Sequence, residues 1–228
     1  MNNIIDSPLI SILLSVYNDD KNIKKSIDSI LLQSYKNIEL LVIDDCSTDK
    51  TYEILKEIKD SRIRIFRNKD NLGLTKSLNI LINKSKGQIL ARQDSDDISL
   101  PTRLEVQLNY LYRLQLDGCT TRAYIKNSKR SIPRLSHLLP LSFVIKYKNP
   151  FIHGTLMVRK NAVIDVGMYD ESIEFAQDYK LFIELLKKNY KIKILNKKLY
   201  VLNMENNISS LRKEEQEDFF RKIQQENL

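Results

Sequence analysis

The sequence predicts an α/β fold in which a central, largely parallel sheet is layered between helices. Short apolar runs alternate with segments of helical periodicity through the N-terminal half, as expected of repeated strand–helix units. Polar and acidic residues follow several of these runs, at the sheet edge where such folds bind ligands. With 228 residues, of which 42% are hydrophobic and 29% charged, the chain suits a single folded domain, 1–228.

The alternation of strands and helices begins close to the N-terminus. Residues 9–16 are an apolar run that predicts a fully buried strand. The apolar stripe of Ile23, Ile27, Ile30 and Leu31 predicts a helix over 22–33. The remaining elements of the first half are a strand at 39–43, a helix through Ile54 to Ile58, a strand at 63–66, a turn at 71–73, a helix around 78–82, a strand at 88–91 and a helix at 101–116.

The second half is less periodic. Residues 117–149 are expected to form a long irregular excursion rich in basic residues. Order is expected to return at 151–158, followed by a turn at Gly167, a helix over 178–188 and a strand over 191–195. We therefore divide the domain into halves at about 8–116 and 117–205, with a charged helical tail over 206–228.

Asp94, Asp96 and Asp97 directly follow the predicted strand 88–91. In an extended backbone residues i and i+2 project to the same side, so we expect Asp94 and Asp96 to face one site. Two carboxylates suit a hard divalent cation that completes its coordination with phosphate oxygens and water. The sequence therefore predicts a Mg²⁺ or Mn²⁺ site. The alternative is that these aspartates cap the helix near Pro101, the role we expect of Asp97.

The segments around these elements form an ordered set of motifs. They are Pro8-Leu9-Ile10-Ser11-Ile12, Ser15-Val16-Tyr17-Asn18, Ser29-Ile30-Leu31-Leu32-Gln33-Ser34-Tyr35, Glu39-Leu40, Asp44-Asp45-Cys46-Ser47-Thr48-Asp49, Asn71-Leu72-Gly73, Gly87, and Asp94-Ser95-Asp96-Asp97 with Pro101. In order and spacing this set resembles the nucleotide-binding half of family 2 glycosyltransferases. The resemblance implies the GT-A fold, a Rossmann-like layered domain with a mixed but mostly parallel sheet.

On the donor side, the resemblance implies that Ser15 and Tyr17 hold the uracil and ribose of a UDP-sugar. Asp45 matches the carboxylate that binds the base, while Asp44 is expected to brace the turn. Asp94 matches a contact to ribose or sugar, and Asp96 matches the metal ligand beside the diphosphate. Strand-end packing is the structural alternative for Ser15 and Tyr17.

On the acceptor side the likeness is looser, through 149–159 and 167–171. His153 and Gln177 are expected to bind the acceptor, although the family often has glutamate where Gln177 stands. Asp178 takes the position of the catalytic base. A helix N-terminus favours its ionised form, and an ionised carboxylate can accept a hydroxyl proton. The alternative role for Asp178 is that of an N-cap.

The resemblance implies an inverting glycosyltransferase, of hexosyl- or N-acetylhexosaminyltransferase type. It would move a sugar from a nucleotide-diphosphate donor, first of all a UDP-sugar, to an acceptor hydroxyl. Asp178 would remove the acceptor proton, and a metal held by Asp96 would neutralise charge on the departing diphosphate. A saccharide or lipid-linked saccharide is the expected acceptor, as in surface polysaccharide synthesis.

Two other functions are alternatives to sugar transfer. A sugar-1-phosphate nucleotidyltransferase should carry a glycine-rich basic loop after the first strand, which residues 15–20 lack. A degenerate, non-catalytic transferase domain that binds nucleotide-sugar or an anionic surface stays open. Nucleic-acid binding is not expected, because no recognised motif or interleaving of aromatic and basic residues is present.

The net charge of +8 suggests anionic partners. The densest basic stretch, which we call the 187–198 lysines, comprises Lys187, Lys188, Lys191, Lys193, Lys197 and Lys198. A solvated surface is the default reading of this stretch, and a membrane-surface patch is the alternative. No apolar run suits a spanning helix or a signal peptide, so the expected location is cytoplasmic, with peripheral contact at the inner face of a membrane.

Overall fold

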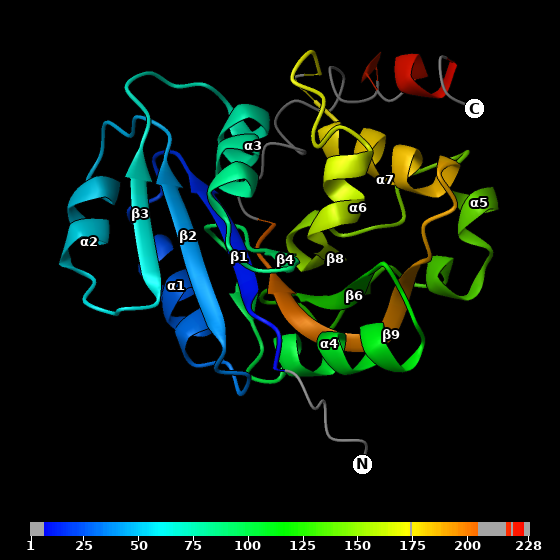
Figure 1. The fold of residues 1–228 in the computed structure, drawn as a ribbon, viewed down its shortest axis with the longest axis horizontal. Helices are drawn as coiled ribbons and strands as arrows, with labels where there is room; N and C mark the ends of the chain where they lie inside the picture. Colours follow the sequence, from blue (N-terminus) through cyan, green and yellow to red (C-terminus); the bar gives the residue numbers. More distant parts are fainter. Residues whose placement is uncertain (1–6, 174, 205–217, 220, 226–228) are drawn as a thin grey trace.

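The computed structural model describes residues 7–173, 175–204, 218–219 and 221–225. Figure 1 shows a curved sheet with helices packed against both faces. The elements in chain order are β1 (Ile10–Val16), α1 (Ile23–Leu31), β2 (Ile38–Asp44), α2 (Thr51–Glu57), β3 (Ile63–Arg67), α3 (Leu74–Lys84), β4 (Ile89–Arg92), β5 (Ile98–Ser99), α4 (Arg103–Arg113), β6 (Gly118–Ile125), β7 (Ser131–Ile132), the 3-10 helix η1 (Ser136–Leu138), α5 (Leu141–Val144), the 3-10 helix η2 (His153–Thr155), β8 (Met157–Arg159), α6 (Lys160–Asp165), α7 (Gln177–Lys187) and β9 (Ile192–Leu202).

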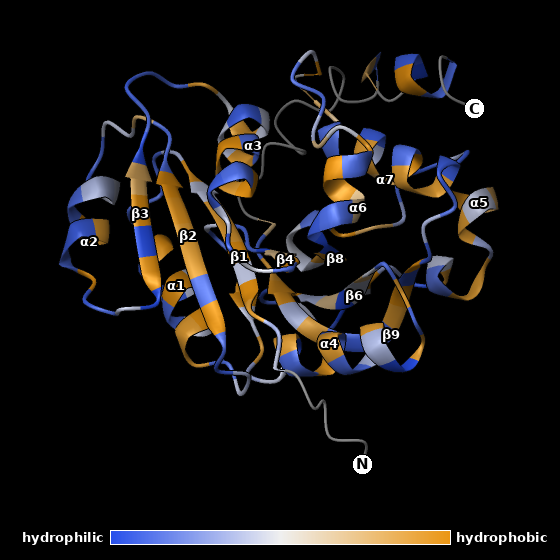
Figure 2. Cartoon of the chain, in the orientation of Figure 1, coloured by the Kyte–Doolittle hydropathy of each residue, from blue (hydrophilic) through white to orange (hydrophobic). Residues whose placement is uncertain are grey.

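The first half of the sheet is parallel, as predicted. Strands β3, β2, β1 and β4 lie side by side in that order. Along β1 the even-numbered residues 10, 12, 14 and 16 join the core under α1 and α4, while Leu13 joins the core under α3, α6 and α7. Such two-sided burial explains why β1 and β2 are almost continuously apolar (Figure 2).

The second half extends the same sheet through β8, β6, β9 and β5. Strand β8 pairs antiparallel with β4 and with β6, whereas β6 and β9 run parallel. The sheet is therefore mixed but mostly parallel in its first half, and the predicted fold class is confirmed.

The prediction that 117–149 is wholly irregular is wrong. Residues 118–125 form β6, a strand between β8 and β9. Its buried positions include Thr120 and Thr121, both fully buried, so the strand carries no apolar alternation that a sequence pattern could reveal. The rest of that segment contains β7, η1 and α5, all of them short.

Strand β9 is longer than the predicted 191–195, because it continues to Leu202. The register between β6 and β9 shifts so that Leu195 pairs with Thr121 and Lys198 with Arg122. The bulge leaves exposed polar residues at 196–198 in the middle of the strand, and this polar interruption is why the sequence pattern ends the strand too early.

Most of the predicted tail, 206–228, lies outside the described residues. The parts that are described, 218–219 and 221–225, are helical, and Ile223 is buried against the core that contains α7. Within the described ranges, no helix has the length and apolarity required to cross a membrane.

Candidate functional site

The candidate site lies at the carboxyl ends of β1, β2 and β4, which meet at one edge of the parallel half of the sheet (Figure 1). The polar segments that follow these strands are therefore neighbours in space although they are far apart in sequence. Several side-chain hydrogen bonds join them. Ser95 Oγ donates to Asp19 Oδ2 over 2.7 Å, and Asn18 N–H donates to Ser47 Oγ over 2.9 Å. The edge is thus a single connected surface.

Residues 94–97 form a turn rather than the extended chain expected from the sequence. Asp97 N–H donates to the Asp94 carbonyl at 3.4 Å. Ser26 Oγ donates to the same carbonyl at 2.7 Å, and Gln93 Nε2 donates to the Asp97 carbonyl at 2.9 Å. The prediction of an extended backbone at 94–96 is therefore wrong. The turn still brings Asp94 and Asp96 close enough that the Asp94 charge raises the pKa of Asp96.

Asp94 is held on three sides. Arg92 Nη2 donates to Asp94 Oδ1, and Asp94 N–H donates to Tyr200 Oη at 3.2 Å. The third neighbour is Gly154, where an added Cβ would overlap both Asp94 Oδ2 and Tyr200 Oη. The carboxylate is thus fixed by residues from β4, β9 and η2, and its side chain remains 31% exposed toward the site.

Asp96 has a strongly perturbed environment. Burial, followed by the charges of Asp94 and Asp19, raises its pKa to about 6, and Lys126 acts in the opposite direction. Asp19 is not among the site residues predicted from the sequence, although its charge acts on Asp96. The available signal was its place directly after β1, at the same sheet edge as the acidic turn.

Asp97 does not cap the helix α4, contrary to expectation. Strand β5 separates the turn from that helix. The Asp97 carboxylate instead accepts the Asn203 N–H at 2.6 Å in a buried position. Burial and the neighbouring carboxylates raise its pKa to about 8. The aspartate therefore ties the acidic turn to the end of β9.

The residues at this turn can supply only part of the coordination sphere of a divalent cation. Among the described residues, no group of three or more His, Cys, Asp and Glu side chains is arranged to hold a metal ion. Asp96 and its acidic neighbours supply hard oxygen donors and an excess of negative charge that a cation would relieve. This donor set fits Mg²⁺ or Mn²⁺ that takes its remaining ligands from phosphate and water.

The predicted base-binding residues lie along the same edge. Ser15 is the penultimate residue of β1, and the Tyr17 side chain that follows the strand is 49% exposed. Asp45 is buried, and its carboxylate accepts Asn68 Nδ2 at 2.7 Å and two backbone N–H groups of residues 72 and 73 at 2.9 and 2.8 Å. Asp45 thus holds the turn at 71–73, and its contact with a base stays a prediction.

Asp44, expected to brace the turn, is fully buried. Its Oδ2 pairs with Arg67 Nε at 3.0 Å, and its Oδ1 accepts the Ser47 N–H at 3.3 Å. Both contacts hold the segment after β2 in place, consistent with that expectation.

Asp178 is the second residue of α7, after the N-cap Ala176, so it is not the N-cap of that helix. Asn149 Nδ2 donates to its Oδ2 at 2.7 Å. Burial raises the pKa of Asp178, and hydrogen bonds from the Tyr179 N–H and from Asn149 only partly oppose this. The backbone N–H groups at the helix N-terminus favour the ionised form, as expected, but desolvation outweighs their effect on the pKa. The Asp94 charge also raises this pKa, which places the two carboxylates within electrostatic range.

His153 begins η2 and meets Tyr169, with 2.6 Å between its Nε2 and the Tyr169 Oη. Burial, and then the Arg92 charge, hold the pKa of His153 well below its usual value, so the ring is neutral at pH 7. Gln177 is half-buried at the first position of α7, next to Asp178. His153, Gln177 and Asp178 therefore come from segments that meet on the acceptor side, and their contact with an acceptor stays a prediction.

Two buried arginines support the site and were missed by the sequence reasoning. Arg92 Nη1 donates to the Leu13 carbonyl at 2.8 Å, and Arg103 Nη1 donates to the carbonyls of Arg92 and Gly154 at 2.9 and 2.8 Å. Arg103 is fully buried with its guanidinium over the Tyr200 ring. Burial lowers its pKa to about 10. Together they tie β1, β4, α4 and η2 behind Asp94.

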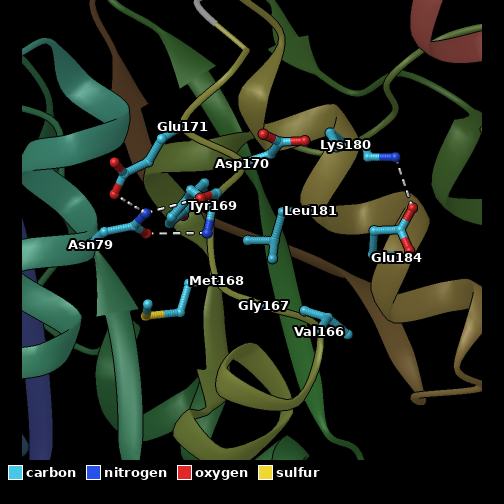
Figure 3. A pocket seen from close by; sticks show the side chains of 10 residues that line it. All are labelled: Asn79, Val166, Gly167, Met168, Tyr169, Asp170, Glu171, Lys180, Leu181 and Glu184. Carbon is cyan, nitrogen blue, oxygen red and sulfur yellow. Dashed lines mark hydrogen bonds and ion pairs between the residues drawn. The ribbon is translucent and has the colours of Figure 1, made fainter.

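A cavity of about 500 Å³ lies away from the acidic turn, between α3, the 166–171 loop and α7 (Figure 3). At its wall, Asn79 Nδ2 donates to the Tyr169 carbonyl and to Glu171 Oε1, both at 2.9 Å. None of the individually predicted site residues lines this cavity, but residues 167–171, one of the two segments expected on the acceptor side, form one of its walls.

Comparison with known sequences gives consistent matches. The sequence profile described as Glycosyl transferase family 2 matches residues 11–173. The Bacillus subtilis protein EpsE, whose assignment as a glycosyltransferase is itself provisional, is 37% identical over 161 residues, covering 68% of this chain and 58% of EpsE. The Escherichia coli O-antigen biosynthesis glycosyltransferase WbnJ is 34% identical over 192 residues, covering 78% of this chain and 72% of WbnJ.

Solved structures share the fold. Residues 1–349 of Staphylococcus aureus TarS in complex with UDP-GlcNAc superimpose with a TM-score of 0.77 at 20% identity, covering 94% of this chain and 65% of that one. The mannosyltransferase PcManGT of Pyrobaculum calidifontis, in complex with GDP-Man and Mn²⁺, gives a TM-score of 0.71 at 18% identity, covering 90% and 60%. The fold of this chain is the GT-A fold. The chain spans about three fifths of the length of EpsE and of these structures.

Proposed function

Because the chain belongs to glycosyl transferase family 2, we propose that it moves a sugar from a nucleotide-diphosphate donor to an acceptor hydroxyl, with inversion at the anomeric carbon. The observation that carries the proposal is the pairing of two carboxylate sites across one sheet edge. One is the acidic turn after β4, and the other is Asp178, which Asn149 orients at the start of α7.

The donor is proposed to be a UDP-sugar. Support comes from the structural similarity to TarS, which has been solved with UDP-GlcNAc, and from the edge formed by Ser15, Tyr17, Asp45 and Asp94. Asp94 would contact ribose or sugar in the position fixed by Arg92 and Tyr200. Transfer of a hexose or an N-acetylhexosamine is the finer expectation.

Asp96 is the residue proposed to hold Mn²⁺ or Mg²⁺. When bound, the cation would supply positive charge beside the donor diphosphate. This chain's own contribution is an acidic turn whose carboxylates repel one another, so that binding a cation there is favourable.

The reaction itself is a single displacement. Asp178 accepts the proton of the acceptor hydroxyl while that oxygen forms a bond to the anomeric carbon, and the bond from this carbon to the diphosphate oxygen breaks. The nucleoside diphosphate then leaves with the bonding electrons. A base whose pKa is raised by burial is better matched to neutral pH than an exposed aspartate. His153, neutral and bonded to Tyr169, and Gln177 would orient the acceptor.

The acceptor is proposed to be a saccharide or a lipid-linked saccharide in surface polysaccharide synthesis. The support is the similarity to WbnJ, an O-antigen biosynthesis enzyme by name. The cytoplasmic location stays a prediction.

The test is a comparison of nucleotides followed by a screen of donors. Calorimetric titration with UDP, GDP and dTDP in Mn²⁺ should show preference for UDP, and release of UDP from one of a panel of UDP-sugars should follow. Tighter binding of GDP would reassign the donor. Binding of UDP without release from any sugar donor or acceptor mixture would favour the non-catalytic reading.

A further inference from the structure

An exposed apolar patch lies on the segment that leads from β7 to the acceptor side. It consists of five large side chains within 13 residues, each 52–68% exposed: Leu135, Leu138, Leu139, Phe143 and Tyr147. Single exposed apolar residues are common on protein surfaces, but a run of five on one short segment indicates a contact surface. We call these five residues the 135–147 patch.

The patch is part of a packed segment and not a loose loop. Val144 and Ile145 are buried beneath it, and Tyr179 Oη donates to the Ile145 carbonyl at 2.6 Å. The rings of Phe143 and Tyr147 lie against each other on the outer side, with centroids 5.1 Å apart. Since the segment is anchored through its inner residues, the outward direction of its apolar side chains is fixed by the fold.

The chain segment that carries the patch has charges of one sign only. Residues 118–164 contain nine Lys and Arg residues and no Asp or Glu, in a chain that has 29 acidic residues in total. Lys146 within the patch segment, and Arg134 and Lys148 on either side of it, are exposed. In the part of the chain that the structure describes, none of these three forms an ion pair with a carboxylate. Exposed apolar and basic groups together are the signature of contact with an anionic interface.

The 187–198 lysines differ from this patch in two ways: two of the six pair with carboxylates, and exposed large apolar side chains are absent among the described residues of that stretch. Lys188 pairs with Asp165 at 2.9 Å, and Lys187 pairs with Glu184 at 3.4 Å. No described side chain between 187 and 198 is an exposed large apolar residue. The basic stretch that the sequence singled out therefore lacks the apolar component that interfacial binding needs.

We propose that the 135–147 patch, with Arg134, Lys146 and Lys148, docks this protein on the surface of an anionic lipid bilayer. The apolar side chains enter the boundary between headgroups and acyl chains, and the three cations lie at the level of the lipid phosphates. Figure 1 places α5, which carries Phe143, at the end of the molecule opposite α2 and β3.

The docked surface would lie beside the acceptor half of the site. Lys148 immediately precedes Asn149, whose side chain bonds Asp178. A bilayer held at the patch would therefore run next to the segment that orients this carboxylate. The docking inference does not depend on the proposed function, because lipid binding is measured without any donor or acceptor.

The test is co-sedimentation of the protein with vesicles of phosphatidylcholine alone and of phosphatidylcholine mixed with phosphatidylglycerol. We expect binding to the mixed vesicles, little binding to the neutral ones, and weakening as salt increases. Changing Leu138, Phe143 and Tyr147 together to Ser should weaken binding to mixed vesicles by roughly tenfold or more. Because these side chains are exposed, the melting temperature should change little.

Matched variants separate the two basic surfaces. The pair Lys146→Glu and Lys148→Glu should abolish binding, whereas Lys191→Glu with Lys193→Glu, which changes the net charge equally, should leave most of it. Leu32→Ser, which removes a side chain 72% exposed elsewhere, should leave binding intact.

Three outcomes would overturn the proposal. The first is equal binding to neutral and anionic vesicles, and the second is loss of binding only in the variant changed at Lys191 and Lys193. The third is that the protein binds no vesicles and is a dimer by light scattering, while the variant with three Ser substitutions is a monomer. The last result would identify a second copy of this chain as the occupant of the patch.

Discussion

The two carboxylate sites of this protein reach raised pKa values in different ways. At the acidic turn, Asp96 is surrounded by other carboxylates, and both burial and their charges raise its pKa. At the start of α7, burial dominates, and Asp178 is held by hydrogen bonds from Asn149 and from the helix backbone. The first environment favours a cation and the second favours uptake of a proton from a neighbour. The same residue type thus serves two roles because of what surrounds it.

The largest expected effect is that of a substitution at Asp178. Asp178→Asn keeps the shape of the side chain but removes its ability to accept a proton, so we expect turnover to fall by about 10²–10⁴-fold. Glu184→Gln, the same chemical change on the same helix, should retain turnover within about twofold, because its ionic partners are Lys180 and Lys187 and it contacts none of the predicted site residues. Release of UDP from the donor with acceptor present measures both. Full activity of Asp178→Asn would move the base elsewhere.

Gly154 tests how tightly the acidic turn is positioned. In Gly154→Ala the new Cβ would overlap Asp94 Oδ2 and Tyr200 Oη, and we expect a loss of about 1–3 kcal/mol of unfolding free energy together with weaker UDP binding. Gly167→Ala is the control, because its φ of +88° makes alanine strained by about 1–2 kcal/mol although the surrounding space is open. That variant should be less stable yet bind UDP normally. Equal UDP binding by both variants would show that Asp94 is not held by this contact.

A substitution at Asn149 tests what sets the pKa of Asp178. The Asn149 amide stabilises the ionised carboxylate, so Asn149→Ala should raise the pKa of Asp178 further. Since the base must be ionised, turnover falls as pH decreases through this pKa. The acidic limb of the pH profile should therefore move upward by roughly 0.5–1 pH unit, given about 1 kcal/mol for one hydrogen bond.

The control for this experiment is Asn196→Ala, which removes an exposed hydrogen bond to Arg122 and should leave the pH profile in place. A uniform loss of turnover at every pH in Asn149→Ala would mean that Asn149 positions Asp178 without affecting its ionisation.

The sequence predicts the first half of the fold better than the second for a physical reason. Strands β1 and β2 are buried on both faces and are apolar at most positions, so their pattern is unambiguous. Strand β6 is equally central but fills its buried positions with Thr120 and Thr121, and β9 is interrupted by an exposed bulge at 196–198. Such elements are defined by their neighbours in the sheet, which a local pattern does not contain.

In the candidate site, too, some residues can be predicted from the sequence and others cannot. Asp94, Asp96 and Asp178 stand out in the sequence because each begins or follows a recognisable element. Arg92 and Arg103 are indistinguishable in sequence from surface charges, and only the fold shows that both are buried behind Asp94. The direction of the Asp178 pKa shift was also beyond the sequence, since the burial that decides it comes from segments distant along the chain.

The most direct test of the two-carboxylate account is calorimetric titration of UDP into the wild type, Asp96→Asn and Asp178→Asn, each with Mn²⁺ and then with EDTA. We predict that the wild type and Asp178→Asn bind UDP more tightly with Mn²⁺ than with EDTA, and that Asp96→Asn loses this difference. Retention of the full metal dependence by Asp96→Asn, or its loss in Asp178→Asn, would contradict the assignment of one carboxylate to the cation and the other to the proton.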